Sequence, residues 1–290
     1  MLNPIEPQLI RSVAELGRYS DAARALGRRI ALVPTMGALH EGHLSLVRVA
    51  YQHADRVIVS IFVNPTQFGP AEDFARYPRD LARDLDLLRK VGVEVVFAPS
   101  VEEIYPSGDA TWVEVDRLTS GLCGRSRPGH FRGVTTVVAR LFNAARPHVA
   151  VFGEKDYQQL AVIRRMARDL AFGIEVIGGP IVREPDGLAM SSRNVFLSAR
   201  ARQQATALHA ALHEARALVR GGVRDAAALC EEARRRIEKE PLAEIDYVEL
   251  VDAETLEPLR EVRGPAVLAL AARFEGTRLI DNTLLEAETL

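Results

Sequence analysis

The chain has 290 residues, of which 48% are hydrophobic and 26% charged, and no segment has a biased composition. These values exclude an intrinsically disordered chain and predict one large domain or two ordinary ones, big enough to bury a hydrophobic core. The 37 basic and 39 acidic residues give a net charge of −2, which excludes the strongly basic surface of a non-specific nucleic-acid-binding protein.

The first residues and the two cysteines bear on the compartment of the protein. The N-terminal sequence has an acidic residue and prolines where a signal peptide has basic residues and an apolar run. No run approaches the roughly 20 apolar residues of a membrane span. Cys123 and Cys230 lack the spacing of a disulfide framework or a zinc cluster. We therefore expect a cytoplasmic protein without membrane or nucleic-acid partners.

Helical and strand patterns alternate along the first 178 residues. Ser12 and Glu15 fit a capping box and Gly27 fits a helix stop, which predicts a first helix between them. Short apolar runs rich in Val and Ile follow, as is typical of strands covered on both faces. These predicted strands are residues 30–33, 57–63, 93–98, 149–152 and 174–177. Helical spacing occurs between them, at residues 44–47, 81–88, 134–141 and 160–167.

This alternation predicts an α/β fold, a Rossmann-like parallel sheet with helices on both faces, because parallel strands need crossover connections. The later pattern differs: helices are predicted at about 198–219 and 224–239, then strands at 245–251, 266–271 and 278–280. We therefore expect a Rossmann-like domain over residues 1–183 and a small C-terminal α+β domain over residues 184–290. His209 and His213, on the longer helix, are predicted to face solvent.

The first of these strands leads into the sequence PTMGALHEGH, residues 34–43, and helical spacing begins directly after it. A strand-to-helix turn offers free N–H groups and the positive end of the helix dipole, both of which suit phosphate. Gly37 and Gly42 allow a sharp turn and a close ligand approach, and His40 and His43 share one face of the first helical turn. The zinc-protease motif HExxH and the P-loop both fail here, because the histidine spacing is too short and no lysine follows Gly42 directly.

Two later segments offer further phosphate-binding groups. The sequence GEKD, residues 153–156, follows a predicted strand and carries Lys155, one of only three lysines in the chain. The sequence MSSR, residues 190–193, opens the predicted C-terminal domain and suits a mobile phosphate clamp. Taken alone, a solvated charged loop explains the first segment and a helix N-cap the second.

The segment PTMGALHEGH ends in the pattern HxGH, and we call it the HxGH turn. Together, the HxGH turn, the GEKD turn and the MSSR loop resemble the nucleotidylyl-transferase-like superfamily. The longer strings PTMGALHEGHLSLV, SIFVNPTQFGPAEDFARYPR, GRSRPGHFRGVTTVV, VFGEKDYQQL and GLAMSSRNVFLS resemble the pantothenate synthetase family, the pantoate–β-alanine ligases of coenzyme A biosynthesis. The resemblance spans about residues 30–200. It implies an ATP-dependent, AMP-forming ligase that joins pantoate to β-alanine through a pantoyl adenylate, with Mg²⁺ carried by ATP. It also implies a homodimer, and a C-terminal domain that acts as a lid beginning with the MSSR loop.

The same resemblance implies the roles of individual residues. An anionic carboxylate must approach an anionic triphosphate, so positive charge and hydrogen-bond donors are needed, whereas neutral amides orient pantoate without adding charge. The implied catalytic residues are His40, His43, Lys155 and Arg193. The implied ATP contacts are Met36, Gly37, His40, Gly42, His43, Gly153, Glu154, Lys155, Asp156, Val182, Met190, Ser191, Ser192 and Arg193. The candidate substrate-binding residues are Asn64, Gln67, Arg127 and Gln159.

Three questions stay open at the level of sequence. His43 fits either a proton donor, the role implied by the resemblance, or a charged donor to phosphate. No base is identifiable for the amine of β-alanine. Two alternatives are an adenylyltransferase that stops at a nucleotide product and shares the HxGH turn, and a nucleotide sensor whose loops bind ATP without turnover.

Overall fold

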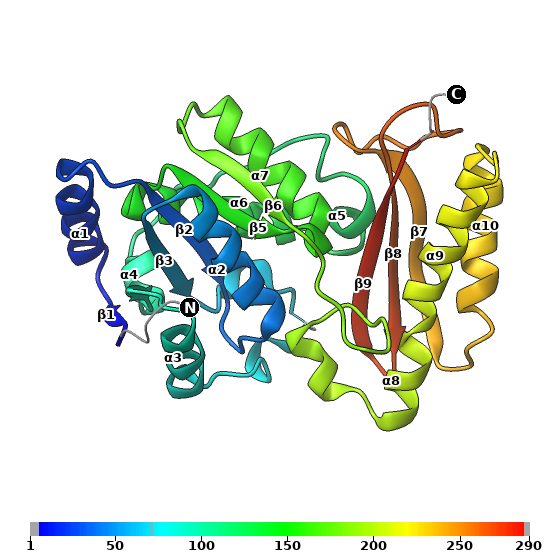
Figure 1. Ribbon diagram of the computed structural model, residues 1–290, viewed down its shortest axis with the longest axis horizontal. Coiled ribbons are helices and arrows are strands. Elements are labelled where there is room, and N and C mark those ends of the chain that lie inside the picture. The colour runs from blue at the N-terminus through cyan, green and yellow to red at the C-terminus, as the bar shows by residue number, and fades with distance from the viewer. Residues whose placement is uncertain (1–5, 71, 287–290) are drawn as a thin grey trace. The chain divides into compact units, whose positions relative to one another are not determined.

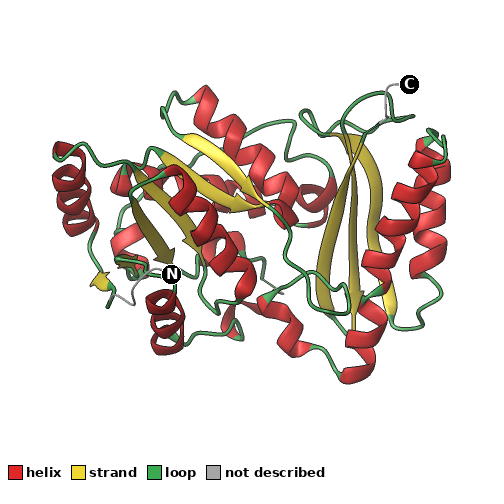
Figure 2. Ribbon diagram, viewed as in Figure 1, coloured by secondary structure: helices red, strands yellow, loops and turns green. Residues whose placement is uncertain are grey.

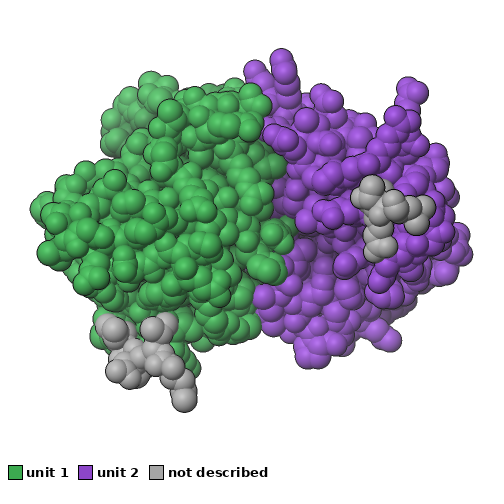
Figure 3. Space-filling view, turned by 45° about the horizontal axis from the view of Figure 1, so that its top comes forward, with its two compact units in different colours: residues 1–115, 127–154, 159–180 green, residues 116–126, 155–158, 181–290 purple. Residues whose placement is uncertain are grey.

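The computed structural model describes residues 6–70 and 72–286. The chain divides into two compact units, which Figure 3 shows in different colours. Unit 1 comprises residues 1–115, 127–154 and 159–180, and unit 2 comprises residues 116–126, 155–158 and 181–290. Within the described residues, no helix has both the length and the apolar composition needed to cross a bilayer.

Unit 1 contains a six-stranded sheet in which every neighbouring pair of strands is parallel (Figure 1). The strand order is β1–β4–β3–β2–β5–β6. The strands are β1 (Gln8–Ile10), β2 (Ile30–Thr35), β3 (Arg56–Ile61), β4 (Val95–Phe97), β5 (Val149–Gly153) and β6 (Glu175–Gly179). The predicted parallel sheet is confirmed.

Helices cover both faces of this sheet. Ala31 and Val33 of β2 belong to a buried cluster with residues of α2 and α3. Phe152 of β5 contributes to the other face, where its ring contacts Phe142 of α6. The helices are α1 (Val13–Ala25), α2 (Glu41–His53), α3 (Leu81–Lys90), α4 (Val101–Ile104), α6 (His130–Ala145) and α7 (Tyr157–Asp169). The predicted α/β layering is therefore confirmed.

Unit 2 contains a three-stranded antiparallel sheet, β7–β8–β9, with helices packed on it (Figure 2). Alternate residues of β8, from Ala266 to Phe274, point into one buried cluster with α8, α9 and α10. The elements are α5 (Leu122–Ser126), α8 (Ala199–Ala205), α9 (Ala207–Arg220), α10 (Ala226–Ile237), β7 (Ala243–Asp252), β8 (Ala266–Phe274) and β9 (Thr277–Leu285). The predicted small α+β architecture is confirmed.

Some local predictions are wrong. Strand β1 was not predicted from the sequence, and the helix predicted over residues 198–219 is two helices that meet at Thr206. His213 is exposed as predicted, but His209 is only partly exposed. A Cβ added at Gly187 would lie 2.4 Å from Cδ2 of His209, so this imidazole packs against a glycine rather than facing solvent.

Candidate functional site

The order of the strands reverses between β2 and β5, since β3 and β4 lie on one side of this pair and β6 on the other. Ligands of open α/β sheets bind outside the carboxyl ends of the strands at such a switch point. The HxGH turn begins at Met36, after the end of β2, and Glu154 directly follows β5. The HxGH turn and the GEKD segment, whose Gly153 and Glu154 belong to unit 1, therefore start from neighbouring strand ends.

The turn between β2 and α2 has left-handed backbone at Gly37, with φ of 78°, and at Ala38, with φ of 50°. A Cβ at Gly37 would lie 2.9 Å from Oδ2 of Asp84, so the position requires glycine for space as well as for conformation. Asp84, buried on α3, accepts hydrogen bonds from the amides of Ala38 and Leu39 at 2.9 and 2.8 Å. Burial raises the pKa of Asp84, while these two amides lower it. A carboxylate that was not predicted from the sequence thus holds the HxGH turn.

His40 and His43 use the same ring nitrogen to cap α2. Nδ1 of His40 accepts from the amide of Gly42 at 3.2 Å, and Nδ1 of His43 accepts from the amide of His40 at 3.3 Å. A ring nitrogen that accepts carries no proton, so each neutral imidazole has its proton on Nε2. The ring centroids are 4.1 Å apart. The two histidines therefore form a pair of Nε2–H donors at a helix N-terminus, where negative charge is stabilised.

The segment after β3 forms the 3₁₀ helix η1 (Pro65–Gln67), and Asn64 fixes its shape. Asn64 is 1% exposed, and its Nδ2 donates to Oε1 of Gln67 at 3.0 Å and to the carbonyl of Gly133 at 3.1 Å. Its Oδ1 accepts from the hydroxyl of Tyr105 at 2.8 Å. Because Oε1 of Gln67 accepts from Asn64, Nε2 is the donor end of this amide, and it donates to Sδ of Met36 at 3.2 Å.

Arg127 forms an ion pair close to η1. Its Nε and Nη2 both lie 2.6 Å from the carboxylate oxygens of Glu72, which is a bidentate arrangement. Burial raises the pKa of Glu72, but the hydrogen bonds and charge of Arg127 outweigh burial and lower this pKa to about 2. Nη2 of Arg127 also donates to the carbonyl of Gln67 at 3.3 Å, and Nδ1 of His130 lies 2.8 Å from the same oxygen. The charge of this predicted substrate-binding arginine is therefore paired inside the protein.

The GEKD turn follows β5 as a short 3₁₀ turn. A Cβ at Gly178 of β6 would lie 2.8 Å from Oε1 of Glu154, so this glycine makes room for the carboxylate within unit 1. Lys155 belongs to unit 2, where its carbonyl accepts from Nδ2 of Asn282 at 2.9 Å. The side chain of Lys155 is partly buried and that of Asp156 is exposed.

The two glutamines at the start of α7 differ in their environments. Gln158 is buried, and it accepts from the amide of Cys123 and donates to the carbonyls of Leu118 and Gly121, all in unit 2. These bonds give Gln158 a structural role in unit 2. Gln159, the predicted substrate-binding residue, belongs to unit 1 and is partly exposed.

The predicted ATP-binding residues beyond residue 180 lie around a short hairpin in unit 2, which an isolated antiparallel bridge between Arg183 and Ala189 closes. The amide of Met190 donates to the carbonyl of Val182 at 3.0 Å, which joins the two ends of the hairpin. Oγ of Ser191 then accepts from the amide of Arg193 at 3.2 Å and caps a short 3₁₀ helix. These backbone bonds place Val182 next to the start of the MSSR loop.

The predicted site residues are thus divided between the two units. Unit 1 holds Met36, Gly37, His40, Gly42, His43, Asn64, Gln67, Arg127, Gly153, Glu154 and Gln159. Unit 2 holds Lys155, Asp156, Val182, Met190, Ser191, Ser192 and Arg193. Asp84, Glu72 and His130 were not predicted from the sequence. Of these, only His130 had a sequence signal, its place in the motif RPGH beside Arg127.

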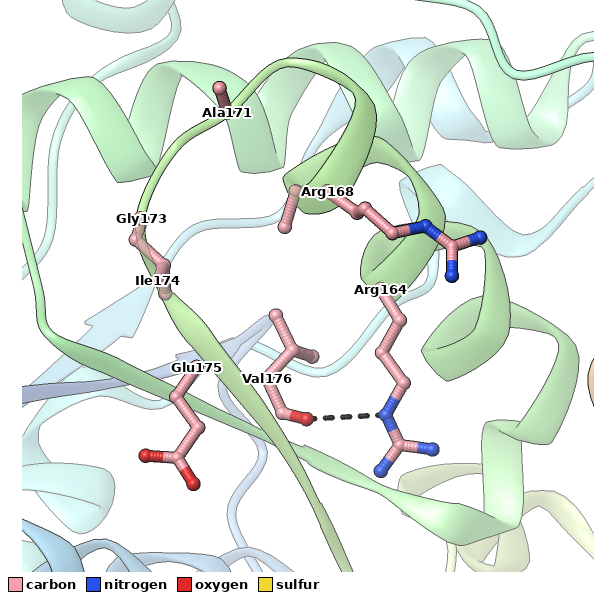
Figure 4. Close-up of a pocket in the computed structure, with 8 residues that line it drawn as sticks. Arg164, Arg168, Ala171, Gly173, Ile174, Glu175 and Val176 are labelled. Atoms are coloured by element: carbon pink, nitrogen blue, oxygen red, sulfur yellow. Dashed lines mark hydrogen bonds between the residues drawn. The ribbon is translucent and has the colours of Figure 1, made fainter.

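A hollow of about 420 Å³ lies elsewhere on unit 1, between the end of α7 and the start of β6 (Figure 4). It is lined by Arg164, Arg168 and Glu175, among others, and Nε of Arg164 donates to the carbonyl of Val176 at 3.2 Å. Residues 173–176 lead into β6 and begin it, so the hollow lies at the amino end of this strand. Ligands of such sheets bind at the carboxyl ends of the strands. This hollow is therefore not part of the candidate site.

The sequence matches the family described as pantoate-beta-alanine ligase over residues 8–284. The chain belongs to the pantoate–β-alanine ligase family. Two relatives named pantothenate synthetase, from Moorella thermoacetica and Heliobacterium modesticaldum, are 58% and 57% identical to it. Each alignment covers 96% of this chain and 99% of the relative.

Solved structures of this ligase family have the same fold. Pantothenate synthetase from Thermus thermophilus superposes with a TM-score of 0.89 at 49% identity, over 95% of this chain and 98% of that one. Pantoate-beta-alanine ligase from Francisella tularensis, complexed with beta-gamma ATP and beta-alanine, superposes with a TM-score of 0.81 at 33% identity, over 98% and 99%. The similarity therefore includes residues 201–290, in which the sequence has few recognisable motifs.

Proposed function

We propose that the protein catalyses the ATP-dependent, AMP-forming condensation of pantoate with β-alanine. Its membership of the pantoate–β-alanine ligase family supports this proposal, as does the complex of the Francisella tularensis ligase with an ATP compound and β-alanine. The observation that carries this proposal is the arrangement at the carboxyl ends of neighbouring parallel strands in unit 1. There, two Nε2–H donors stand at a helix N-terminus and the oriented amide of Gln67 follows the adjacent strand.

The proposed reaction has two steps. A carboxylate oxygen of pantoate attacks the α-phosphorus of ATP, the bond to the β-phosphate oxygen breaks, and pyrophosphate leaves. The unprotonated amine of β-alanine then attacks the acyl carbon of pantoyl adenylate, the bond from this carbon to the AMP oxygen breaks, and the nitrogen loses a proton. Both steps place negative charge on phosphate oxygens, so preorganised donors stabilise their transition states.

The structure favours a donor role for His43 over a proton-transfer role. Its Nδ1 accepts from the amide of His40, so protonating this nitrogen would place two N–H groups face to face. In the neutral ring, Nε2–H is a hydrogen-bond donor but far too weak an acid to give up its proton. We propose that His40 and His43 both donate Nε2–H to the phosphate oxygens of ATP. Lys155 and Arg193 supply positive charge.

The remaining ATP contacts and the substrate contacts are proposed as the sequence predicts them. The proposed ATP contacts are Met36, Gly37 and Gly42, Gly153, Glu154 and Asp156, Val182, and Met190, Ser191 and Ser192. The amides of Gln67 and Gln159 are proposed to orient pantoate, with Asn64 and Arg127 close to that site. The division into a nucleotide- and pantoate-binding domain over residues 1–183 and a lid over residues 184–290 is part of the same proposal.

We propose that Mg²⁺ enters as part of the ATP substrate. Among residues 6–70 and 72–286, no group of three or more His, Cys, Asp or Glu side chains is arranged to hold a metal ion. Magnesium binds readily through the phosphates of its nucleotide and keeps several water molecules, so it does not require a protein cage. A homodimer and a cytoplasmic location complete the proposal, by similarity to the ligase family.

The adenylate mechanism is tested by leaving out β-alanine. With ATP, Mg²⁺ and pantoate alone, we expect about one pyrophosphate per active site, followed by AMP and pantothenate only after β-alanine is added. If ATP stays intact, the proposed mechanism is wrong. ATP binding without pyrophosphate from any carboxylate would instead identify a nucleotide sensor. A stable nucleotide product that β-alanine does not consume would identify an adenylyltransferase.

A further inference from the structure

We propose that His130 is a positioning residue for Gln67. Together with Arg127 and Glu72 it forms what we call the Gln67 clasp, a set of hydrogen bonds that fixes the peptide group of Gln67. The clasp keeps the Gln67 amide in the orientation that pantoate requires, and none of its three side chains needs to touch pantoate. This inference rests on the proposed function and extends it to His130 and Glu72, which are outside the predicted site.

The clasp acts first on the carbonyl oxygen of Gln67. Nδ1 of His130 lies 2.8 Å from this oxygen, and Nη2 of Arg127 donates to it at 3.3 Å. A carbonyl oxygen has two lone pairs, so these donors occupy its accepting capacity. The backbone of Gln67 is therefore held from two sides.

The partners of His130 select a single protonation state. The Gln67 carbonyl only accepts, so Nδ1 of His130 must carry a proton. Nε2 lies 3.0 Å from Nη1 of Arg127, and a guanidinium only donates, so Nε2 must be unprotonated. The neutral Nδ1–H tautomer is thus the only form that satisfies both contacts, the opposite tautomer from that of His40 and His43.

Glu72 fixes the arginine of the clasp. Its carboxylate takes two hydrogen bonds from Arg127, both of 2.6 Å, and the plane of the guanidinium is set by this bidentate contact. The side chains of Arg127 and Glu72 are 15% and 26% exposed, which limits screening by solvent. Since the pKa of Glu72 is lowered to about 2, the pair stays charged at neutral pH.

The backbone at the start of α6 brings the clasp close to η1. A Cβ added at Gly133 would lie 2.4 Å from the carbonyl oxygen of Thr66 and 2.8 Å from the amide nitrogen of Gln67. Only glycine permits this approach. The opposite end of Gln67 is held as well, because Asn64 donates to its Oε1. With the backbone and one end of the amide fixed, the Nε2 donor of Gln67 has a defined direction, toward Sδ of Met36 at 3.2 Å, a weak acceptor that an oxygen of pantoate can replace.

Three substitutions of His130 test the clasp. The side-chain amide of asparagine can donate from near the position of Nδ1. The side-chain amide of glutamine lies near the position of Nε2 instead, and alanine has no hydrogen-bonding group. One net hydrogen bond is worth about 1 kcal/mol, so we expect KM for pantoate to rise about fivefold to tenfold in His130→Ala and His130→Gln. In His130→Asn we expect a rise of at most about twofold. KM for ATP should stay within about twofold in all three, because the HxGH turn is untouched.

The exposed His213 of α9 provides the control, and His213→Ala should match wild type in both KM values. Thermal unfolding of each variant reports on folding; if His130→Ala does not fold, the comparison of asparagine with glutamine decides. Equal KM values for pantoate in the asparagine and glutamine variants, or a parallel rise in KM for ATP, would overturn the clasp. Wild-type protein that releases no pyrophosphate with pantoate would instead refute the proposed function.

Discussion

His40 and His43 show how a short motif gains its chemistry from the backbone around it. The sequence places two imidazoles one helical turn apart but leaves their protonation undecided. In the structure, Nδ1 of each ring accepts from a main-chain amide, so the donors are the Nε2–H groups. His130 holds its proton on the other nitrogen, because its partners are a carbonyl and a guanidinium. The role of each histidine follows from these neighbours and not from its residue type.

Lys155 offers a sharp test of charge at a single residue. It is partly buried after β5, whereas Lys90 and Lys239 are exposed. Loss of a preorganised donor to developing charge costs about 10² to 10³ in kcat, and we expect this loss in Lys155→Ala. Lys155→Arg should fail to restore the rate although it keeps the charge, because a planar guanidinium is larger than an ammonium and donates in a different geometry.

The measurement is the initial rate of pyrophosphate release with saturating ATP and pantoate. Lys239→Ala removes an exposed lysine two residues after the end of α10 and serves as the matched control, with an expected rate equal to wild type. A wild-type rate in Lys155→Ala would remove this lysine from the site. Full activity in Lys155→Arg would show that charge alone is sufficient.

At the level of elements, α3 acts on the HxGH turn through one side chain. Asp84 is 1% exposed and accepts from two amides of a turn whose Ala38 has an unfavourable left-handed backbone. In Asp84→Asn, one carboxylate oxygen becomes an NH₂ group that faces a main-chain N–H. Leaving a buried donor unsatisfied costs about 1–3 kcal/mol, and we expect the free energy of unfolding to fall by this amount. The rate should fall too, because the turn carries His40 and His43.

Urea unfolding and the rate of pyrophosphate release measure the two effects. Asp86→Asn is the control on the same helix: this exposed carboxylate pairs with Arg89 at the surface, and its loss should change stability by less than about 0.5 kcal/mol. If Asp84→Asn is as stable and as active as Asp86→Asn, the carboxylate does not hold the turn.

The elements that the sequence predicts best are those buried on both faces. The run at residues 30–33 indicates a strand because every residue of it is buried in β2. The three residues of β1 lie at the edge of the sheet and give too short a pattern. The boundary at Thr206 between α8 and α9 also has no sequence signal, because the alanine-rich spacing continues across it. His209 is less exposed than the sequence predicts because its packing partner, Gly187, belongs to another segment of the chain, the hairpin before the MSSR loop.

For the whole molecule, the sequence places the candidate site residues only where they directly follow a predicted strand. The HxGH turn, Gln67 and the GEKD turn each follow a buried strand, so a parallel sheet implies a common edge for them. Asp84, Glu72 and His130 do not follow this rule. Asp84 and His130 bind main-chain groups and Glu72 binds the side chain of Arg127, all distant in sequence, and only the packing of the elements of unit 1 brings these groups together. The sequence therefore indicates candidate groups at strand ends, whereas the groups that hold these candidates in place are found only from the structure.

The whole molecule also yields a prediction about its thiols. Cys123 is buried, Cys230 is partly buried, and neither forms a disulfide. Burial raises the pKa of the Cys230 thiol, which lowers the fraction of reactive thiolate near neutral pH. Two large buried clusters, one in each unit, account for stability without a cross-link. We therefore expect a reducing agent to leave the Tm unchanged, as measured by thermal unfolding with and without it.

A thiol-specific reagent provides the second measurement, and its readout is the number and order of modified cysteines. In denaturant both thiols should react at once, whereas in the native protein Cys230 should react slowly and Cys123 more slowly still, in the order of their exposure. A Tm that falls on reduction, or fewer than two reactive thiols in denaturant, would contradict the expectation. The first result would mean that the fold depends on a bond between these sulfurs, and the second that at least one of them is already bonded or modified.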